Sequence, residues 1–342
     1  METILVFAFL ETDGSLGKAG REAVTAGRSL CDALGASLVF GLIGESLTTA
    51  AQQAGGLGAN RVFGVAGPEF ATARYVTDAL AAEAICRTAQ AAIVVAAGTS
   101  RAARALPGAA HRLGGRVDTH VTGLAAESGT ISVTRWYYRQ RMEAVLQRAR
   151  RPWVILVDPG CFTACDAAAA PVSIEAIPVQ VPALRTTVTG FQSPAADAQT
   201  IRPDAELLFV AGAGWTKVQS DGKAHAPEAA DLILGFLRGA KASLGGSKSL
   251  VDLSGEGQAV LPFMTHLNQI GQTGATPRHP KGLATCCHGE EPHTVGWRFI
   301  NERRAVNLDP NCGWARGKAD VLYVADAFAV MAKVNALLSN DQ

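Results

Sequence analysis

Apolar runs and helical patterns alternate along the first hundred residues of the chain. Short, almost wholly apolar runs occur at residues 4–10, 37–43, 61–65 and 92–97. Two longer stretches, 21–34 and 71–89, repeat apolar residues with a period of 3.6 and predict helices. Strands that are apolar on both faces and alternate with helices are typical of a parallel sheet covered on both sides. The pattern therefore predicts a doubly wound α/β layer.

The remaining pattern predicts the end of this layer, a linker and a second α/β series. Residues 117–125, 131–138 and 153–157 predict further strands, for which antiparallel pairing is an option. Residues 166–203 are rich in Ala, Pro, Thr and Ser, which suits an interdomain crossing and a hinge. Beyond it we predict strands at 206–211 and 249–253 and helices at 226–244 and 321–338. We expect two doubly wound parallel-sheet domains, 1–165 and 204–342, joined by residues 166–203.

Bulk composition excludes several classes of protein. Of the 342 residues, 48% are hydrophobic and 18% charged, as in globular α/β proteins. A net charge of +1 provides no general attraction for nucleic acid. No apolar run reaches the roughly 20 residues of a membrane helix, and no signal peptide is recognisable, so we expect a cytoplasmic protein. The odd number of cysteines, seven, favours reduced thiols over a disulfide framework.

Two glycine-containing segments are candidate ligand sites. Gly212-Ala213-Gly214 follows an apolar strand, where glycine permits close backbone approach to a phosphate. An ordinary strand-to-helix turn is an equal alternative. Gly271-Gln272-Thr273-Gly274 brackets an amide and a hydroxyl, which suit the polar edge of a flavin ring. For this segment alone, a polar hairpin is the competing interpretation.

Other chemistry-bearing residues lack a supporting context. There is no Gly-x-Ser-x-Gly elbow, His-Glu-x-x-His helix, complete Walker A motif or GxGxxG motif. Cys286, Cys287 and Cys312 lie near candidate site residues, but adjacent cysteines rarely supply two ligands to one ion, and we expect no metal. A concentration of arginines indicates either a docking face for an acidic partner or a solvated surface: Arg135, Arg139, Arg141, Arg148, Arg150 and Arg151.

In chain order, the motifs of the C-terminal half resemble those of the electron transfer flavoprotein α subunit family. That family carries Gly-Arg-Gly, Gly-Ala-Ser-Arg, Val-Gly-Gln-Thr-Gly, Ser-Gly-Ala-Ile-Gln-His and Asn-Lys-Asp-Pro segments, then an Ala-Asp dipeptide. The corresponding segments here are 212–214, 245–248, 270–274, 287–293, 307–310 and 319–320. The resemblance is close over residues 206–330 and looser over the N-terminal half.

The resemblance implies a nucleotide-hydrolase-like N-terminal domain and a flavodoxin-like C-terminal domain that binds FAD. It further implies a heterodimer with a β subunit that carries AMP, a flavin-dependent dehydrogenase as electron donor and a quinone reductase or other acceptor. The residues that it places around FAD are Gly212, Ala213, Gly214, Ser247, Lys248, Gly271, Gln272, Thr273, Gly274, His288, His293, Asn307, Asp309 and Asp320.

Three departures from the family motifs leave other functions open. Ala213 and Lys248 stand where the family has arginine, and residues 277–291 differ from the family's small and apolar loop. Arginine and lysine do not bind phosphate or planar groups in the same way. These departures motivate a second hypothesis, a docking subunit of a larger oxidoreductase with weakened FAD binding. A nucleotide-binding dehydrogenase module is a third.

Overall fold

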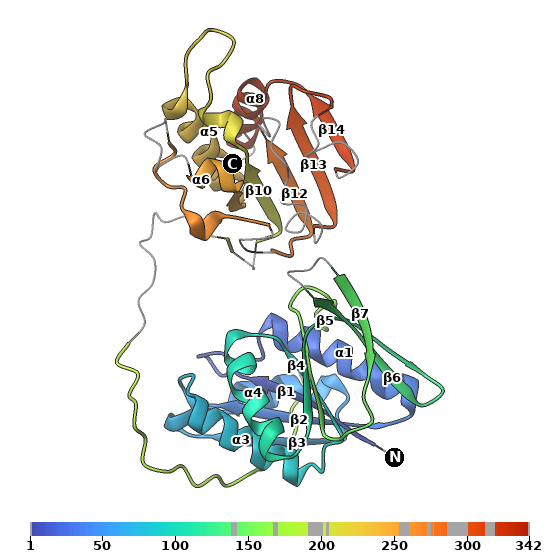
Figure 1. Cartoon of the computed structure of the whole chain (residues 1–342). Helices are drawn as coiled ribbons and strands as arrows, with labels where there is room; N and C mark the ends of the chain where they lie inside the picture. Colours follow the sequence, from blue (N-terminus) through green and yellow to red (C-terminus); the bar gives the residue numbers. More distant parts are fainter. Residues whose placement is uncertain are drawn as a thin grey trace. The chain divides into compact units, whose positions relative to one another are not determined.

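The computed structural model describes residues 2–137, 142–166, 170–190, 201–202, 205–252, 260–271, 275, 277–285, 300–311 and 319–340. The chain divides into two compact units, Met1–Gly190 and Phe191–Gln342. Each unit contains its own sheet with helices beside it (Figure 1). Both units are α/β, as the alternation of apolar runs and helices predicts.

The first unit is built on a sheet in the order β7-β6-β5-β8-β4-β1-β2-β3-β9. Its parallel part confirms six predicted strands: β1 (Thr3–Phe9), β2 (Ser37–Gly44), β3 (Arg61–Ala66), β4 (Ile93–Ala97), β8 (Trp153–Val157) and the start of β5 (Arg116–Glu127). A short strand that was not predicted, β9 (Glu175–Ala176), pairs with β3 inside the segment expected to be an interdomain crossing. The central strands are buried on both faces, which explains why their sequences are continuous apolar runs.

Helices cover both faces of this sheet (Figure 1). They are α1 (Lys18–Leu34), α2 (Thr48–Ala54), α3 (Tyr75–Thr88) and α4 (Ser100–Arg112), with 3-10 turns at Gly55–Leu57 and Pro68–Phe70. Val6 points into the core that includes α1, whereas its neighbour Phe7 packs in the core with α3 and α4. Alternate residues of each strand therefore contribute to separate cores.

The far end of the sheet is antiparallel, through β6 (Thr130–Tyr137) and β7 (Met142–Gln147). The register of β5 shifts between Asp118 and Val121 and again before Gly123. His120, within this irregular stretch, has a φ of +56°. Such bulges bend a strand, and here they separate the parallel start of β5 from its antiparallel continuation.

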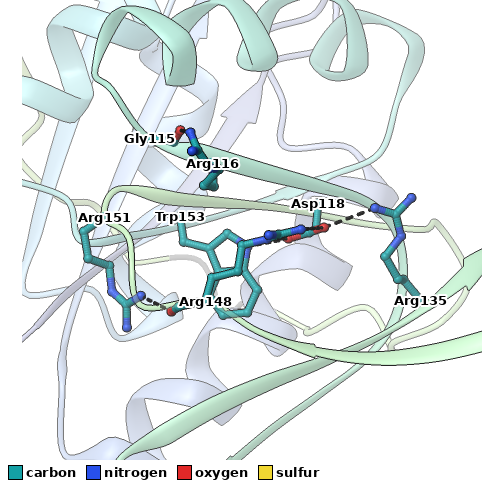
Figure 2. A network of polar contacts seen from close by, with 7 residues as sticks. All are labelled: Gly115, Arg116, Asp118, Arg135, Arg148, Arg151 and Trp153. Carbon is teal, nitrogen blue, oxygen red and sulfur yellow. Dashed lines mark hydrogen bonds and ion pairs between the residues drawn. The ribbon is translucent and has the colours of Figure 1, made fainter.

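A buried carboxylate connects the segments around this bend (Figure 2). Asp118 is fully buried and accepts hydrogen bonds from the guanidinium groups of Arg135 (3.1 Å) and Arg148 (Nη2, 2.8 Å). It also accepts one from the indole of Trp153 (2.9 Å). The carboxylate thus connects β5, β6, the end of β7 and β8. Arg135 and Arg148 are engaged inside the unit, and Arg151 pairs with Glu2.

The second unit contains a five-stranded parallel sheet in the order β11-β10-β12-β13-β14. Its elements are β10 (Leu207–Ala211), η3 (Ala213–Thr216), α5 (Ala226–Ala240), β11 (Ser243–Gly246), α6 (Lys248–Asp252), η5 (His266–Asn268), β12 (Lys281–Thr285), β13 (Glu302–Asn307), β14 (Val321–Val324) and α8 (Ala327–Asn340). In chain order the strands lie 2-1-3-4-5, which is the flavodoxin-like arrangement.

The structure corrects three predicted elements of the second unit. The helix expected at 226–244 ends at Ala240, and residues 243–246 form β11. The strand expected at 249–253 is wrong, because residues 248–252 form α6. The helix expected from 321 begins at Ala327, after a short strand that pairs with β13. Each error lies where an apolar run is too short to distinguish a buried strand from a helix.

Among the described residues, no helix has the length and apolar character required to cross a membrane.

Candidate cofactor site

The carboxyl edge of the second sheet, where its parallel strands end, brings together most of the described candidate residues. In the strand order, β10 is next to its successor β11 on one side, and its other neighbour, β12, is next to its own successor β13. Doubly wound folds bind ligands where the strand order reverses in this way. Gly212 follows β10 directly, and Ser247 follows β11. Asn307 is the last residue of β13. Parallel pairing therefore aligns groups that are far apart in the sequence.

The backbone of the turn Gly212-Ala213-Gly214 is buried and polarised. Each of its carbonyl oxygens accepts a hydrogen bond from a following residue: Gly212 from the Trp215 N–H (3.3 Å), Ala213 from the Thr216 hydroxyl (3.2 Å) and Gly214 from the Gln219 amide (3.0 Å). Within the described chain, the N–H groups of Ala213 and Gly214 have no acceptor. Buried N–H groups are nearly always paired. Two unpaired donors in one turn therefore suit an anionic ligand such as a phosphate.

Ser247 and Lys248 lie beside this turn. The Ser247 N–H donates to the carbonyl of Ala211 (2.9 Å), and its hydroxyl accepts from the N–H of Leu250 (3.3 Å). Ser247 is 2% exposed, whereas the Lys248 side chain is 48% exposed. The Lys248 ammonium pairs with Asp252, one helical turn further along α6. Ser247 is thus fixed by the fold, and Lys248 presents a partly neutralised cation.

Gly271 lies in a tight turn next to β11. Its φ is +110°, which favours glycine, and its N–H donates to the carbonyl of Ala275 (2.8 Å). The N–H of Ile270 donates to the carbonyl of Gly246 (3.1 Å), which ties this segment to the end of β11. The structure therefore brings Gly271 to the same edge as Ser247. Five predicted site residues fall outside the described part of the chain: Gln272, Thr273, Gly274, His288 and His293.

Asn307 and Asp309 form the corresponding turn after β13. The Asn307 amide donates to the carbonyl of Asp309 (3.4 Å), and the Asp309 carboxylate accepts from the N–H of Asn311 (2.8 Å). Asn307 is 7% exposed. Asn307 is therefore buried at this edge, whereas Asp309 is exposed to solvent.

Asp320 lies away from these residues, immediately before β14 and hence at the opposite edge of the sheet. Its carboxylate accepts the backbone N–H of Arg303 (2.7 Å) and its guanidinium (2.9 Å). These bonds, the backbone one first, lower the pKa of Asp320. Asp320 thus pairs with the amino-terminal end of β13 in this structure.

Asp326, which the sequence did not indicate as a candidate, occupies the carboxyl edge instead. It follows β14, and its carboxylate accepts the N–H of Phe328 (3.0 Å) at the start of α8. Two signals could have identified it. Ala325-Asp326 repeats the dipeptide of Ala319-Asp320, and aspartate before an apolar helical pattern is a common N-cap.

The donor and acceptor groups at this edge suit a dinucleotide. Unpaired backbone N–H groups and an ammonium complement phosphate oxygens, while the Asn307 amide and the Asp326 carboxylate suit hydroxyl groups. Among the described residues, no cluster of three or more His, Cys, Asp or Glu side chains could hold a metal ion.

The described cysteines are free thiols. Burial raises the pKa of Cys31 to about 11 and that of Cys86 to about 12. Both thiols are therefore protonated and unreactive at neutral pH. Cys286, Cys287 and Cys312 lie outside the described residues.

Comparison with known protein families identifies the family of the first half of the chain. The family model described as "Electron transfer flavoprotein domain" matches residues 4–182. This range includes all nine strands of the first sheet. No curated protein matches the chain.

Proposed function

The chain belongs to the electron transfer flavoprotein family, and on this basis we propose that it is an α subunit that carries FAD in its C-terminal unit. The observation that supports this most is the second parallel sheet, whose carboxyl edge gathers Ser247, Gly271 and Asn307 beside the Gly212–Gly214 turn. These groups come from separate segments of the chain, and their convergence at one edge suits an extended ligand.

Each group at this edge has a proposed task. The N–H groups of Ala213 and Gly214 would donate to the pyrophosphate, and Lys248 would compensate part of its charge. Ser247, Asn307 and Asp326 would bind hydroxyl groups or ring heteroatoms. Bound FAD would supply the redox chemistry.

The proposed partners follow from the same assignment. The chain would pair with an electron transfer flavoprotein β subunit that carries AMP. It would receive electrons from a flavin-dependent dehydrogenase and deliver them to a quinone reductase or another acceptor. No nucleic acid is needed for this role, and we propose that it takes place in the cytoplasm.

A second candidate function is a docking subunit with weakened FAD binding. Two observations favour it: Ala213, where the family has arginine, is 1% exposed and brings no charge, and Lys248 is already paired with Asp252. In that case the fold would persist, while the site would provide little beyond backbone donors.

The visible spectrum of the purified complex with its β subunit separates the two candidates. We expect a flavin spectrum with stoichiometric FAD, and an intact wild-type complex without colour would contradict the proposal.

We further expect Lys248→Met to weaken FAD binding about tenfold, because a charged hydrogen bond contributes about 1.5 kcal/mol or more. Lys241→Met, before the opposite end of β11, serves as the matched control and should bind FAD like the wild type.

A further inference from the structure

The turn Gly212-Ala213-Gly214 is held from behind by a hydrogen-bonded pair, Trp215 and Thr285. Both residues are fully buried. The indole N–H of Trp215 donates to the Thr285 hydroxyl (2.8 Å), and that hydroxyl donates to the carbonyl of Val210 (3.2 Å). The Thr285 carbonyl accepts the N–H of Gly212 (2.9 Å). Thr285, at the end of β12, therefore holds both the first residue of the turn and the residue that follows it.

A ring contact extends this support to the last helix. The ring of Trp215 packs on that of Phe328, with centroids 4.7 Å apart and planes tilted by 54°. Phe328 lies in the first turn of α8, where its N–H is bound by Asp326. Trp215 thus connects the turn after β10 to the end of β12 and to the start of α8.

The composition of the turn makes this support important for anion binding. Residues 212–216 contain no cationic side chain, because Ala213 occupies the position of the family's arginine. Within the turn itself, only backbone donors can then meet the negative charge, and they do so only if their N–H groups are oriented correctly. All three carbonyl oxygens of the turn accept hydrogen bonds from protein donors, whereas the N–H groups of Ala213 and Gly214 find no acceptor among the described residues.

We propose that the Trp215–Thr285 pair is a positioning device that orients the backbone N–H groups of Ala213 and Gly214 toward the pyrophosphate of FAD and so determines its affinity. Neither side chain touches the ligand in this role. The inference rests on the proposed function, since it assumes that FAD occupies this edge.

The test is the FAD dissociation constant of the complex with the β subunit, measured by the rise in flavin fluorescence on dilution. Trp215→Phe keeps the ring on Phe328 but removes the N–H, and Thr285→Val keeps the volume but removes the hydroxyl. We expect each to raise the dissociation constant about tenfold. The double variant should be no worse than the stronger single variant, because both remove the same bond.

Two controls separate positioning from general loss of stability. Thr285→Ser keeps the hydroxyl group, so this variant should bind FAD within about twofold of the wild type. Phe236→Leu removes the ring contact with Phe209 in the same hydrophobic core. It should lower the melting temperature without changing FAD affinity. Circular dichroism establishes that each variant is folded, and Trp215→Phe suffices if Thr285→Val does not fold.

The outcomes distinguish this inference from the function on which it rests. If the wild-type complex binds no FAD, the proposed function fails and the inference falls with it. If the wild type binds FAD and Trp215→Phe binds it equally well, the positioning role alone is overturned. Equal weakening by Trp215→Phe and Phe236→Leu would also overturn it, because a general packing effect would then explain both.

Discussion

Asp118 carries its charge in the interior because its neighbours compensate for the loss of water. Burial by itself would raise the pKa of this carboxyl, but hydrogen bonds from Arg148 and Trp153, with Arg135 in addition, outweigh it and lower the pKa. Two guanidinium groups and one indole surround one carboxylate (Figure 2). Removing a single member of such a buried group costs far more than breaking an exposed ion pair.

We predict that Asp118→Asn lowers the free energy of unfolding by about 3 kcal/mol at neutral pH, because both arginines lose their counter-charge. A depressed folded-state pKa stabilises the fold at pH values above the unfolded-state pKa, which is about 4. This stabilisation disappears as the pH falls through the lower, folded-state value. Urea unfolding at a series of pH values should therefore show the difference between wild type and variant shrinking below about pH 4.

The matched control is Glu175→Gln, which breaks an exposed pair with Arg61 on the same sheet. It should change stability little, because water and salt screen such pairs. Equal effects of the two substitutions, or a pH-independent effect of Asp118→Asn, would contradict the role assigned to Asp118.

At the scale of elements, helix α1 approaches β1 closely because Gly27 has no side chain. A Cβ at this position would lie 2.3 Å from Cγ2 of Val6, a residue that is itself fully packed. Alanine forms helices better than glycine by about 1 kcal/mol, but overpacking a core costs about 1–3 kcal/mol. Helix propensity and packing therefore act in opposite directions at this residue.

We predict that packing prevails and that Gly27→Ala lowers the free energy of unfolding by about 1–2 kcal/mol. Chemical denaturation of the purified protein measures this. Adding Val6→Ala removes the clashing methyl groups, so the double variant should lose less stability than the two single changes summed. Simple additivity would show that the clash is relieved in another way.

Element types were predictable where a long pattern was available and failed where it was short. Helix α1 has a clear 3.6-residue period and strands β1 to β4 are continuous apolar runs, and all five were predicted. The four-residue strands β11 and β14 were assigned to neighbouring helices, because only pairing with β10 and β13 makes them strands. Intrinsic propensity over four residues is too small to compete with such pairing.

At the scale of the whole molecule, the chain forms two units, and the first of them ends in a segment that is not packed. Residues 182–187 are exposed and form no helix or strand, and no hydrogen bond ties residues 182–190 to the rest of the described chain. Arg185 lies in the middle of this stretch. Exposed segments without hydrogen bonds are preferred sites of proteolysis.

Limited trypsin digestion should therefore cut first after Arg185 and release two fragments that each resist further digestion. Mass spectrometry identifies the site, and Arg185→Gln should delay the cut. Early cleavage inside either sheet, or rapid loss of one fragment, would show that the two units do not fold independently.

The sequence by itself determined the two α/β series and the position of Gly212 at the end of a strand, because periodicity and backbone constraints are local, whereas the strands before Ser247 and Asn307 emerged only in the structure. It could also show that arginines gather after residue 135. Only the tertiary structure decided that Arg135 and Arg148 meet on Asp118, 17 and 30 residues away in sequence. The structure likewise placed Asp326, and not Asp320, at the carboxyl edge, and it joined Trp215 to Thr285 across 70 residues. Such contacts depend on which strands become neighbours, and strand order is a property of the whole sheet that no local pattern specifies.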